Sequence, residues 1–202
     1  GKTAGLAIYG AKQFNDGRYL DIIAKGNRLK NDFTVHNSLG TSLSGDYRNT
    51  GASLSLEYGK RIKRNNGFYI DPSAELILRR LSGESFDART NTGSTVHINS
   101  DAVNSAIGRL GIGIGKEAKN SNVLLKAALA HEFSGKMKAT YSIAGEPTIN
   151  SVVVLKDTWL DLELGGSWSF RPNTYVYGTF TKNFGSTVDT SYRVDAGIRH
   201  NF

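Results

Sequence analysis

The stretch that decides the fold is Thr158-Trp159-Leu160-Asp161-Leu162-Glu163-Leu164-Gly165-Gly166-Ser167-Trp168. Leucines at every second position alternate with the acidic residues Asp161 and Glu163. Successive side chains of a β-strand point to opposite faces of the sheet. The period of two therefore predicts a strand with one apolar face and one polar face.

The same alternation recurs along the chain, in stretches longer than most strands of soluble proteins, whereas the helical period is hard to find. We count nine predicted strands and assign the chain to the all-β class as one domain over residues 1–202. The strands begin near Ala4, Tyr19, Ala52, Phe68, Ala106, Val123, Thr158, Tyr175 and Tyr192.

The predicted connections alternate between two lengths. Tight turns at residues 15–17, 65–67, 120–122 and 172–173 alternate with longer polar loops at about 37–49, 87–94, 142–151 and 183–190. Short turns on one rim and long loops on the other are typical of an antiparallel up-and-down transmembrane β-barrel in an outer membrane. Pro72 lies early in a predicted strand, so we expect a bulge or an unpaired rim position there.

The residue types on the polar face predict which way each face points. Acids and bases occur there in nearly equal numbers and can pair, and Gly111, Gly113 and Gly115 leave room for crowded side chains, as in a narrow lumen. The predicted lumen-lining residues are Asp21, Lys25, Glu57, Glu75, Arg79, Arg109, Lys126, Asp161, Glu163, Lys182, Arg193, Asp195 and Arg199. The predicted lipid-facing residues are Leu54, Leu56, Leu76, Leu78, Leu160, Leu162 and Leu164.

Aromatic residues near the strand ends are predicted to form the two belts that mark membrane interfaces. On the short-turn side these are Phe14, Tyr19, Phe68, Trp168, Phe170, Tyr175 and Phe202. On the loop side they are Phe33, Phe86 and Phe133.

Composition and missing motifs narrow the function. The chain has 25 Lys and Arg against 18 Asp and Glu, and no cysteine, so disulfides and thiol chemistry are excluded. The basic run at residues 60–64 borders a turn and lacks the aromatic platforms that bind bases, so we expect no nucleic-acid partner. Glycines 108–115 miss the phosphate-loop pattern, and the four histidines lack metal-ligand spacing. We expect no enzyme activity, no metal and no cofactor.

Several segments in order resemble the translocator barrel of monomeric autotransporters, the type V secretion proteins of Gram-negative bacteria. They are Gly17-Arg18-Tyr19-Leu20-Asp21, the Leu-Ser-Leu-Glu-Tyr-Gly strand at 54–59, Phe68-Tyr69-Ile70-Asp71-Pro72-Ser73-Ala74-Glu75-Leu76, Arg80-Leu81-Ser82-Gly83-Glu84-Ser85-Phe86, and residues 107–116. The resemblance covers nearly the whole chain.

The resemblance implies a twelve-stranded barrel in the outer membrane that anchors and exports its own passenger domain through a linker. The nine strands correspond to the fourth to twelfth of that barrel, so we expect the first three strands, the pore helix and the passenger junction to be absent from this chain. No residue here can therefore be assigned to autocleavage.

The last predicted strand resembles the terminal strand that the barrel-assembly machinery reads. The residues that carry this signal are Tyr192, Val194, Ala196, Ile198 and Phe202. An unpaired strand of this kind can add to the edge of another sheet, with alternate side chains setting the register. His200 departs from the family pattern, which usually has an aromatic or aliphatic residue at that position.

Three hypotheses follow for function. The first is a membrane-embedded export module that interacts with outer-membrane lipid, with its own passenger and linker, and with the assembly machinery. The second is an incomplete barrel captured as a folding substrate of that machinery. The third is a porin-like channel without a passenger.

Overall fold

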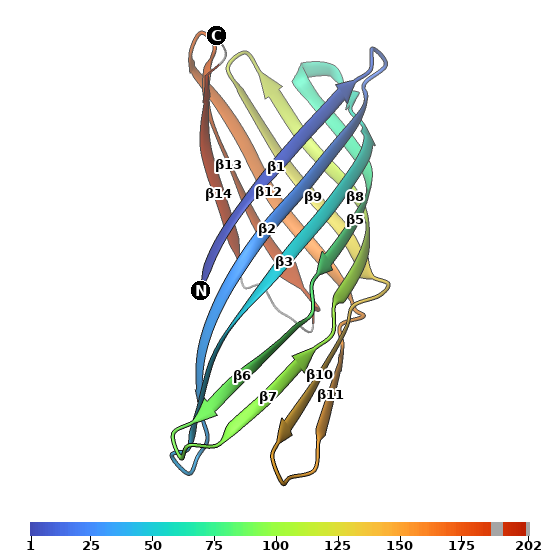
Figure 1. Cartoon of the computed structure of the whole chain (residues 1–202). Coiled ribbons are helices and arrows are strands. Elements are labelled where there is room, and N and C mark those ends of the chain that lie inside the picture. The colour runs from blue at the N-terminus through green and yellow to red at the C-terminus, as the bar shows by residue number, and fades with distance from the viewer. Residues whose placement is uncertain (187–191, 201–202) are drawn as a thin grey trace.

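All strand pairs in the sheet are antiparallel, in the computed structural model that describes residues 1–186 and 192–200. Figure 1 shows the strands wrapped around a common axis. Their bounds are β1 Lys2–Gln13, β2 Arg18–His36, β3 Ser42–Lys60, β4 Ile62–Lys63, η1 Asn65–Gly67, β5 Phe68–Leu81, β6 Glu84–Thr90, β7 Thr95–Ser100, β8 Val103–Ala118, β9 Ser121–Glu132, β10 Lys136–Ile143, β11 Ile149–Val154, β12 Thr158–Arg171, β13 Thr174–Phe184 and β14 Arg193–His200.

These elements correspond to the nine predicted strands. Gaps of two or three residues, at 82–83, 101–102, 133–135 and 155–157, separate β5 from β6, β7 from β8, β9 from β10 and β11 from β12. Each of these pairs is one long passage of the chain across the sheet. The prediction of an antiparallel all-β fold is therefore confirmed.

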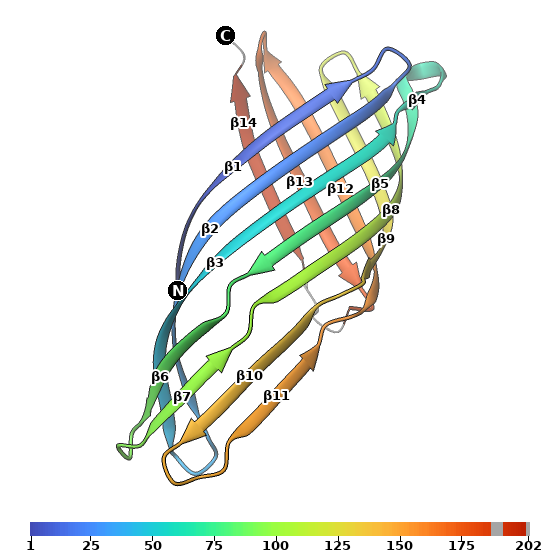
Figure 2. The same cartoon turned by 45° about the vertical axis from the view of Figure 1, so that its right-hand side comes forward.

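The predicted long loops at 37–49, 87–94 and 142–151 are partly strand, so their extent was wrong, and residues 187–190 of the predicted loop at 183–190 lie outside the described residues. Ser42–Lys60, Glu84–Thr90 and Lys136–Ile143 all continue in the sheet, and Figure 2 shows β6, β7, β10 and β11 as hairpins that extend past β12 and β13. A small apolar cluster supports this extension. Ala88, Val96 and Ile98 are buried there, and the partly buried side chains that pack against them are Phe33, Leu43, Phe86 and Tyr141.

The tight turns of the opposite rim are confirmed. The chain reverses between β1 and β2 at residues 14–17, where Gly17 has a φ of 85°. The guanidinium of Arg18 donates to Asp16 over 2.7 Å and lowers the pKa of that carboxyl group. Asn173 takes a φ of 62° in the turn between β12 and β13, a conformation that asparagine tolerates better than most residues.

Pro72 lies in an interruption of one ladder. The pairing of β3 with β5 ends at Gly59 and Ser73, and the pairing of β4 with β5 resumes at Ile62 and Ile70. On the other side Pro72 stays in register with β8. Proline has no N–H to donate. Pro72 lies where β5 has no paired residue on the side of β3 and β4, so no hydrogen bond is lost on that side. The expected unpaired position is therefore present, without a shift of register.

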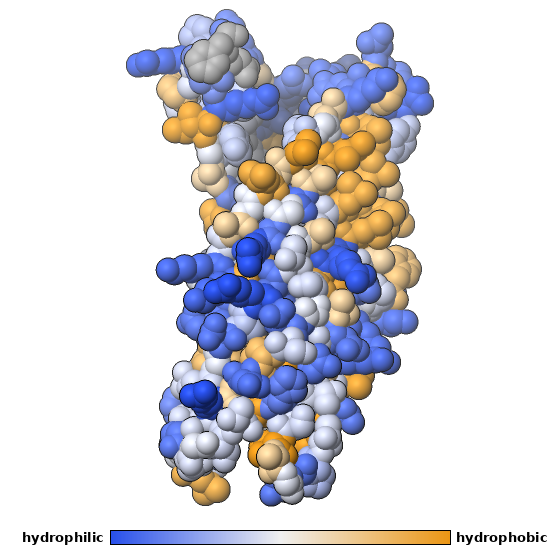
Figure 3. Space-filling view, in the orientation of Figure 1, coloured by the Kyte–Doolittle hydropathy of each residue, from blue (hydrophilic) through white to orange (hydrophobic). Residues whose placement is uncertain are grey.

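The sheet has two distinct faces. We call the face that carries Glu57, Glu75 and Arg109 the inner face, and the face that carries Leu54 and Leu160 the outer face. The seven predicted lipid-facing leucines all lie on the outer face and are between 36% and 52% exposed. Figure 3 shows apolar side chains gathered over the upper part of the molecule. Among the described residues, no helix has the length and hydropathy needed to cross a membrane.

The predicted location of several residues was wrong. Lys182 stands directly opposite Leu162 and therefore lies on the outer face, because residues paired across two strands share a face. Tyr19 and Tyr175 lie on the inner face, paired with Gly59 and Arg199, rather than in an outer belt. Phe33 and Phe86 belong to the apolar cluster of the hairpins.

β1 and β14 are the edge strands at the two ends of the curved wall, and β11 is a third edge strand, in the extended hairpins. Within the described residues, β1 pairs only with β2 and β14 only with β13, so the sheet is not closed. The domain bounds and the absent strands stay predictions.

Candidate functional site

Ion pairs on the inner face connect strands that are not neighbours. Lys126 on β9 lies 2.5 Å from Glu57 on β3, although β5 and β8 run between them. Arg109 on β8 binds Glu75 at 2.7 Å and Asp161, two strands further on, at 3.0 Å. Contacts of this kind require the sheet to curve toward this face, so the inner face is concave.

The five side chains of these pairs are well shielded from solvent. Their exposed fractions run from 9% for Asp161 to 22% for Glu57. The hydroxyl of Ser55 also donates to Glu75 at 2.6 Å. Opposite charges therefore compensate each other where desolvation makes an isolated charge costly.

A second polar group lies nearer the short turns and was not predicted. The hydroxyl of Tyr19 donates to Asp71 at 2.8 Å, and the hydroxyl of Tyr69 donates to Asn122 at 2.8 Å. Arg61 lies 3.4 Å from Asp71 and 4.4 Å from the centre of the Tyr69 ring. Extending the period of two from Asp21 back to Tyr19, and from Glu75 back to Asp71, would have found this group.

Glycines on the inner face make space for these tyrosines. Gly59 stands opposite Tyr19, and Gly115 stands opposite Tyr69. A Cβ added at Gly115 would lie 2.1 Å from Cζ of Tyr69, and one at Gly59 would lie 2.4 Å from Cζ of Tyr19. The ring of each tyrosine thus covers the glycine of the next strand, as aromatic residues do for glycines in sheets.

The remaining predicted inner residues are less tightly held. Asp21 accepts a hydrogen bond from the hydroxyl of Tyr9 at 3.3 Å, and Asp21, Glu57, Lys126 and Glu163 line one hollow of about 930 Å³ at the short-turn end. Lys25 and Arg79 are exposed and make no ion pair with a described residue. On the edge strand Arg193 pairs with Asp195 at 2.9 Å, and Arg199 stands opposite Tyr175.

Some buried polar atoms of the inner face have no hydrogen-bond partner in the described part of the chain. They are Nε of Arg61, Nε of Arg109, Oδ1 of Asp161 and Oγ1 of Thr181. No group of three His, Asp or Glu residues in the described ranges is placed to hold a metal ion.

Three residues of the predicted terminal signal, Val194, Ala196 and Ile198, lie on the last described strand, and Tyr192 directly precedes it. Tyr192, Val194 and Ile198 are 67%, 64% and 72% exposed, and they share the outer face with Ala196. β14 pairs with β13 along its whole length, and its other edge has no described partner. Phe202 lies outside the described residues.

Comparison with known families gives one match over most of the chain. The model of the "Autotransporter beta-domain" family matches residues 1–181. This range includes every inner-face ion pair except the one on β14.

Curated relatives match the same region. Pertactin autotransporter of Bordetella parapertussis is 29% identical over 99% of this chain, and serine protease pet autotransporter of Escherichia coli O44:H18 is 27% identical over 100% of it. BrkA autotransporter of Bordetella pertussis is 34% identical over 57% of the chain. This chain spans 21% of the pertactin sequence and 15% of the Pet sequence, so it matches a minor part of each.

One solved structure supports the fold. The crystal structure of the β domain of the Bordetella autotransporter BrkA superposes with a TM-score of 0.68 at 24% sequence identity, covering 99% of this chain and 74% of that one. At this identity the likeness concerns the arrangement of strands.

Proposed function

Given that this chain belongs to the autotransporter β-domain family, whose barrels lie in the outer membrane of Gram-negative bacteria, we propose that it anchors a passenger domain of its own parent chain and carries the passenger's linker to the cell surface. The observation that supports this most is the ion-paired inner face behind an exposed apolar outer face.

The two faces suit two different solvents. Hydrocarbon chains cannot hydrogen-bond, so only an apolar surface such as that of Leu54, Leu76 and Leu160 can contact them at low cost. A polypeptide in transit exposes N–H and C=O groups that need polar partners or water. The proposal places the linker along Lys25, Glu57, Arg79, Arg109 and Lys126 of the inner face, and lipid against the outer face.

The proposal assigns no catalysis to this domain. Glu57, Glu75 and Asp161 of the inner face are held in ion pairs by Lys126 and Arg109. The proposal assigns cleavage of the passenger to no residue of this chain.

Photo-crosslinking from neighbouring residues tests the path of the linker. A photoreactive amino acid replaces either Arg79, on the inner face, or Leu78, on the outer face, in the full-length parent protein expressed in a Gram-negative host. We expect crosslinks to the linker from position 79 and to lipid from position 78. Crosslinks to the linker from position 78 would contradict the proposal. A porin-like channel would give no linker crosslink at either position.

We further propose that β14 is the strand read by the barrel-assembly machinery, through Tyr192, Val194, Ala196, Ile198 and Phe202. An unpaired edge with regularly spaced apolar side chains can add to another sheet. During biogenesis, crosslinkers at Val194 and Ile198 should reach a strand of the assembly machinery before they reach the parent protein's own first strand. Crosslinks only within the parent protein at all times would contradict this role. A crosslink to the machinery that persists in mature cells would favour the captured-substrate hypothesis.

A further inference from the structure

Four cations lie side by side on the outer face, next to the apolar band, and a fifth lies on β5, on the other side of β3. The register places Lys2 opposite Lys30, and Lys30 opposite Arg48. Arg28 precedes Lys30 by two positions on the same face, and Arg80 lies on β5 opposite Ala52. All five are exposed. We call this set the rim row.

The rim row is electrostatically unfavourable by itself. Like charges directly opposite each other in a sheet destabilise it, and no residue of the row forms an ion pair with a described side chain. Arg80 donates only to the neutral Asn104, at 3.0 Å. The carboxylates Asp32 and Asp46 stand opposite each other one step further from the apolar band. The row therefore presents positive charge at the edge of the band, with no ion pair to a described residue and two carboxylates on its far side only.

The position of the row along the strands matches a membrane boundary. On β2 the outer face runs from Arg18 through Leu20, Ile22, Ala24 and Gly26 to Arg28. Ten residues of a strand tilted by about 40° rise about 25 Å, which is the height of the apolar band of a transmembrane barrel. The row lies toward the long hairpins, which are on the extracellular side of such barrels. Figure 3 shows polar side chains across the middle of the molecule, below the apolar region.

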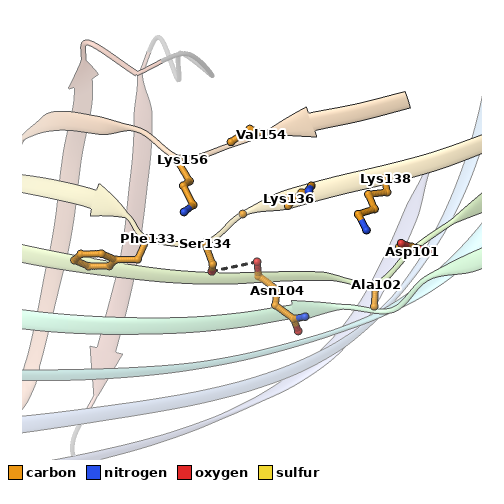
Figure 4. Close-up of a pocket in the computed structure, with 10 residues that line it drawn as sticks. Asp101, Ala102, Asn104, Phe133, Ser134, Lys136, Lys138, Val154 and Lys156 are labelled. Atoms are coloured by element: carbon orange, nitrogen blue, oxygen red, sulfur yellow. Dashed lines mark hydrogen bonds between the residues drawn. The ribbon is translucent and has the colours of Figure 1, made fainter. Parts of the chain in front are cut away.

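A hollow continues the row past β5. It has a volume of about 620 Å³. It lies at residues 133–135, between the end of β9 and the start of β10, and beside the start of β8. Figure 4 shows Lys136, Lys138, Lys156, Phe133 and Asn104 around it. Asn104 is the residue that Arg80 contacts, so the hollow adjoins the rim row. We call it the rim hollow.

The rim hollow combines charge with an apolar base. None of its three lysines forms an ion pair with a described residue, and Asp101 is the one acidic residue in its lining. Phe133 is 58% exposed and stands on the outer face, where a Cβ on Gly108 would meet its ring. Lys136 and Lys138 lie on the outer side of β10, since Tyr141 points into the apolar cluster of the hairpins.

We propose that the rim hollow and the rim row bind the phosphate groups of a phosphorylated lipid of the outer leaflet. The lysines and arginines would hold the phosphates, and Phe133 and the apolar band below would contact the acyl chains. A soluble anion would use the charges alone and would leave the apolar base unused, so the arrangement favours a lipid. The inference rests on the outer-membrane location of the barrel and is independent of the path of the linker.

The test uses the full-length protein, purified in a non-ionic detergent and titrated with diphosphoryl lipid A, with bound lipid counted by native mass spectrometry. One variant carries K136Q, K138Q and K156Q. The matched control carries K12Q, K60Q and K116Q, three outer-face lysines at the short-turn rim that also lack a described ion pair. Since each cation near a lipid surface contributes about a fivefold change in binding, we expect at least about tenfold weaker binding for the rim-hollow variant and less than about twofold change for the control.

Two measurements on the unaltered protein need no variant. Lipid A without phosphates should bind at least about tenfold more weakly, and raising the salt concentration should weaken binding of the phosphorylated form. Equal binding of the two lipids, equal losses in the rim-hollow and control variants, or binding of inorganic phosphate as tight as that of the lipid would overturn the proposal. Display of the passenger on whole cells, measured on the same variants, reports separately on the export function.

Discussion

At the scale of single residues, Arg109 holds the largest group of charges together. It joins Glu75 and Asp161 from opposite sides, with all three side chains largely shielded from solvent. Losing one partner of such a group leaves the remaining charges without compensation, which costs more than the group contributes as a whole. Arg109 therefore matters for the stability of the folded barrel through the two acids that it neutralises.

We predict that Arg109→Gln lowers the free energy of unfolding by about 1–3 kcal/mol. The measurement is urea unfolding of the full-length protein in lipid vesicles, followed by the shift between folded and unfolded bands on a gel. The double variant R109Q/E75Q should recover part of the loss, because it also removes one of the unpaired acids. A double variant less stable than R109Q alone would contradict this account.

Gly115 gives a second prediction at this scale. A Cβ there would overlap the ring of Tyr69, which cannot turn away without losing its hydrogen bond to Asn122. We expect Gly115→Ala to destabilise the barrel by about 1–3 kcal/mol, measured in the same unfolding assay. Gly26→Ala is the matched control, since no atom lies within 4 Å of a Cβ at that strand glycine. Equal effects of the two substitutions would show that the ring contact has no role.

At the scale of elements, Glu132 stabilises the joint between the barrel strands and the hairpins. Its carboxylate accepts from the backbone N–H groups of Ala106 and Ser134 at 2.9 and 3.0 Å, and from the hydroxyl of Ser105. The joint also needs Gly135, which has a φ of 71°. The hydrogen bonds of Glu132 replace those that the strands lose where β9 ends.

We predict that Glu132→Ala destabilises this joint while the rest of the barrel keeps its strands. Removing the acceptor leaves two backbone N–H groups unsatisfied, at a cost of about 1–3 kcal/mol each if no water replaces it. Hydrogen exchange of the full-length protein should rise in β10 and β11 more than in β12 and β13. A uniform rise through all strands, or none, would contradict the prediction.

The sequence predicted the number and order of the strands better than the residues at which the strands begin and end. The alternation from Leu160 to Leu164 and from Leu54 to Tyr58 is strong, because each residue there contacts one uniform environment. The hairpins at 84–100 and 136–154 were missed because Ser, Thr and Asn are as frequent there as in loops, and the cluster around Ile98 forms only when β3, β6, β7 and β10 meet. The alternation of apolar and polar residues within one strand does not show which strands distant in sequence contact each other.

The sequence predicted which charged residues lie on the inner face, but it did not predict which of them form ion pairs with each other. Glu57, Glu75, Arg109, Lys126 and Asp161 were all placed on the polar face from the period of two. Which of them pair depends on the curvature of the sheet, since Glu57 and Lys126 come from β3 and β9. Lys182 was misplaced because the alternation in β13 is weak, and the register with Leu162 corrects it.

At the scale of the whole molecule, the arrangement is a curved sheet whose convex face is apolar and whose concave face carries compensated charges. Charged rows border the apolar band on both sides over the strands from β1 to β5, with Arg18, Lys12 and Lys60 on the short-turn side and Arg28, Lys30 and Arg48 on the other. Both the export function and the lipid site depend on this orientation of the sheet in the membrane.

Single cysteines test that orientation most directly, because residues 1–202 contain no cysteine and any cysteine elsewhere in the parent protein can be replaced by serine. A fluorescent probe is attached to a cysteine at Leu54, Leu162, Lys25 or Arg79 of the full-length protein in vesicles that contain brominated lipid. Quenching by the lipid should be strong at positions 54 and 162 and weak at 25 and 79, and water-soluble quenchers should act in the opposite order. Strong lipid quenching at positions 25 and 79, with positions 54 and 162 protected, would contradict the account.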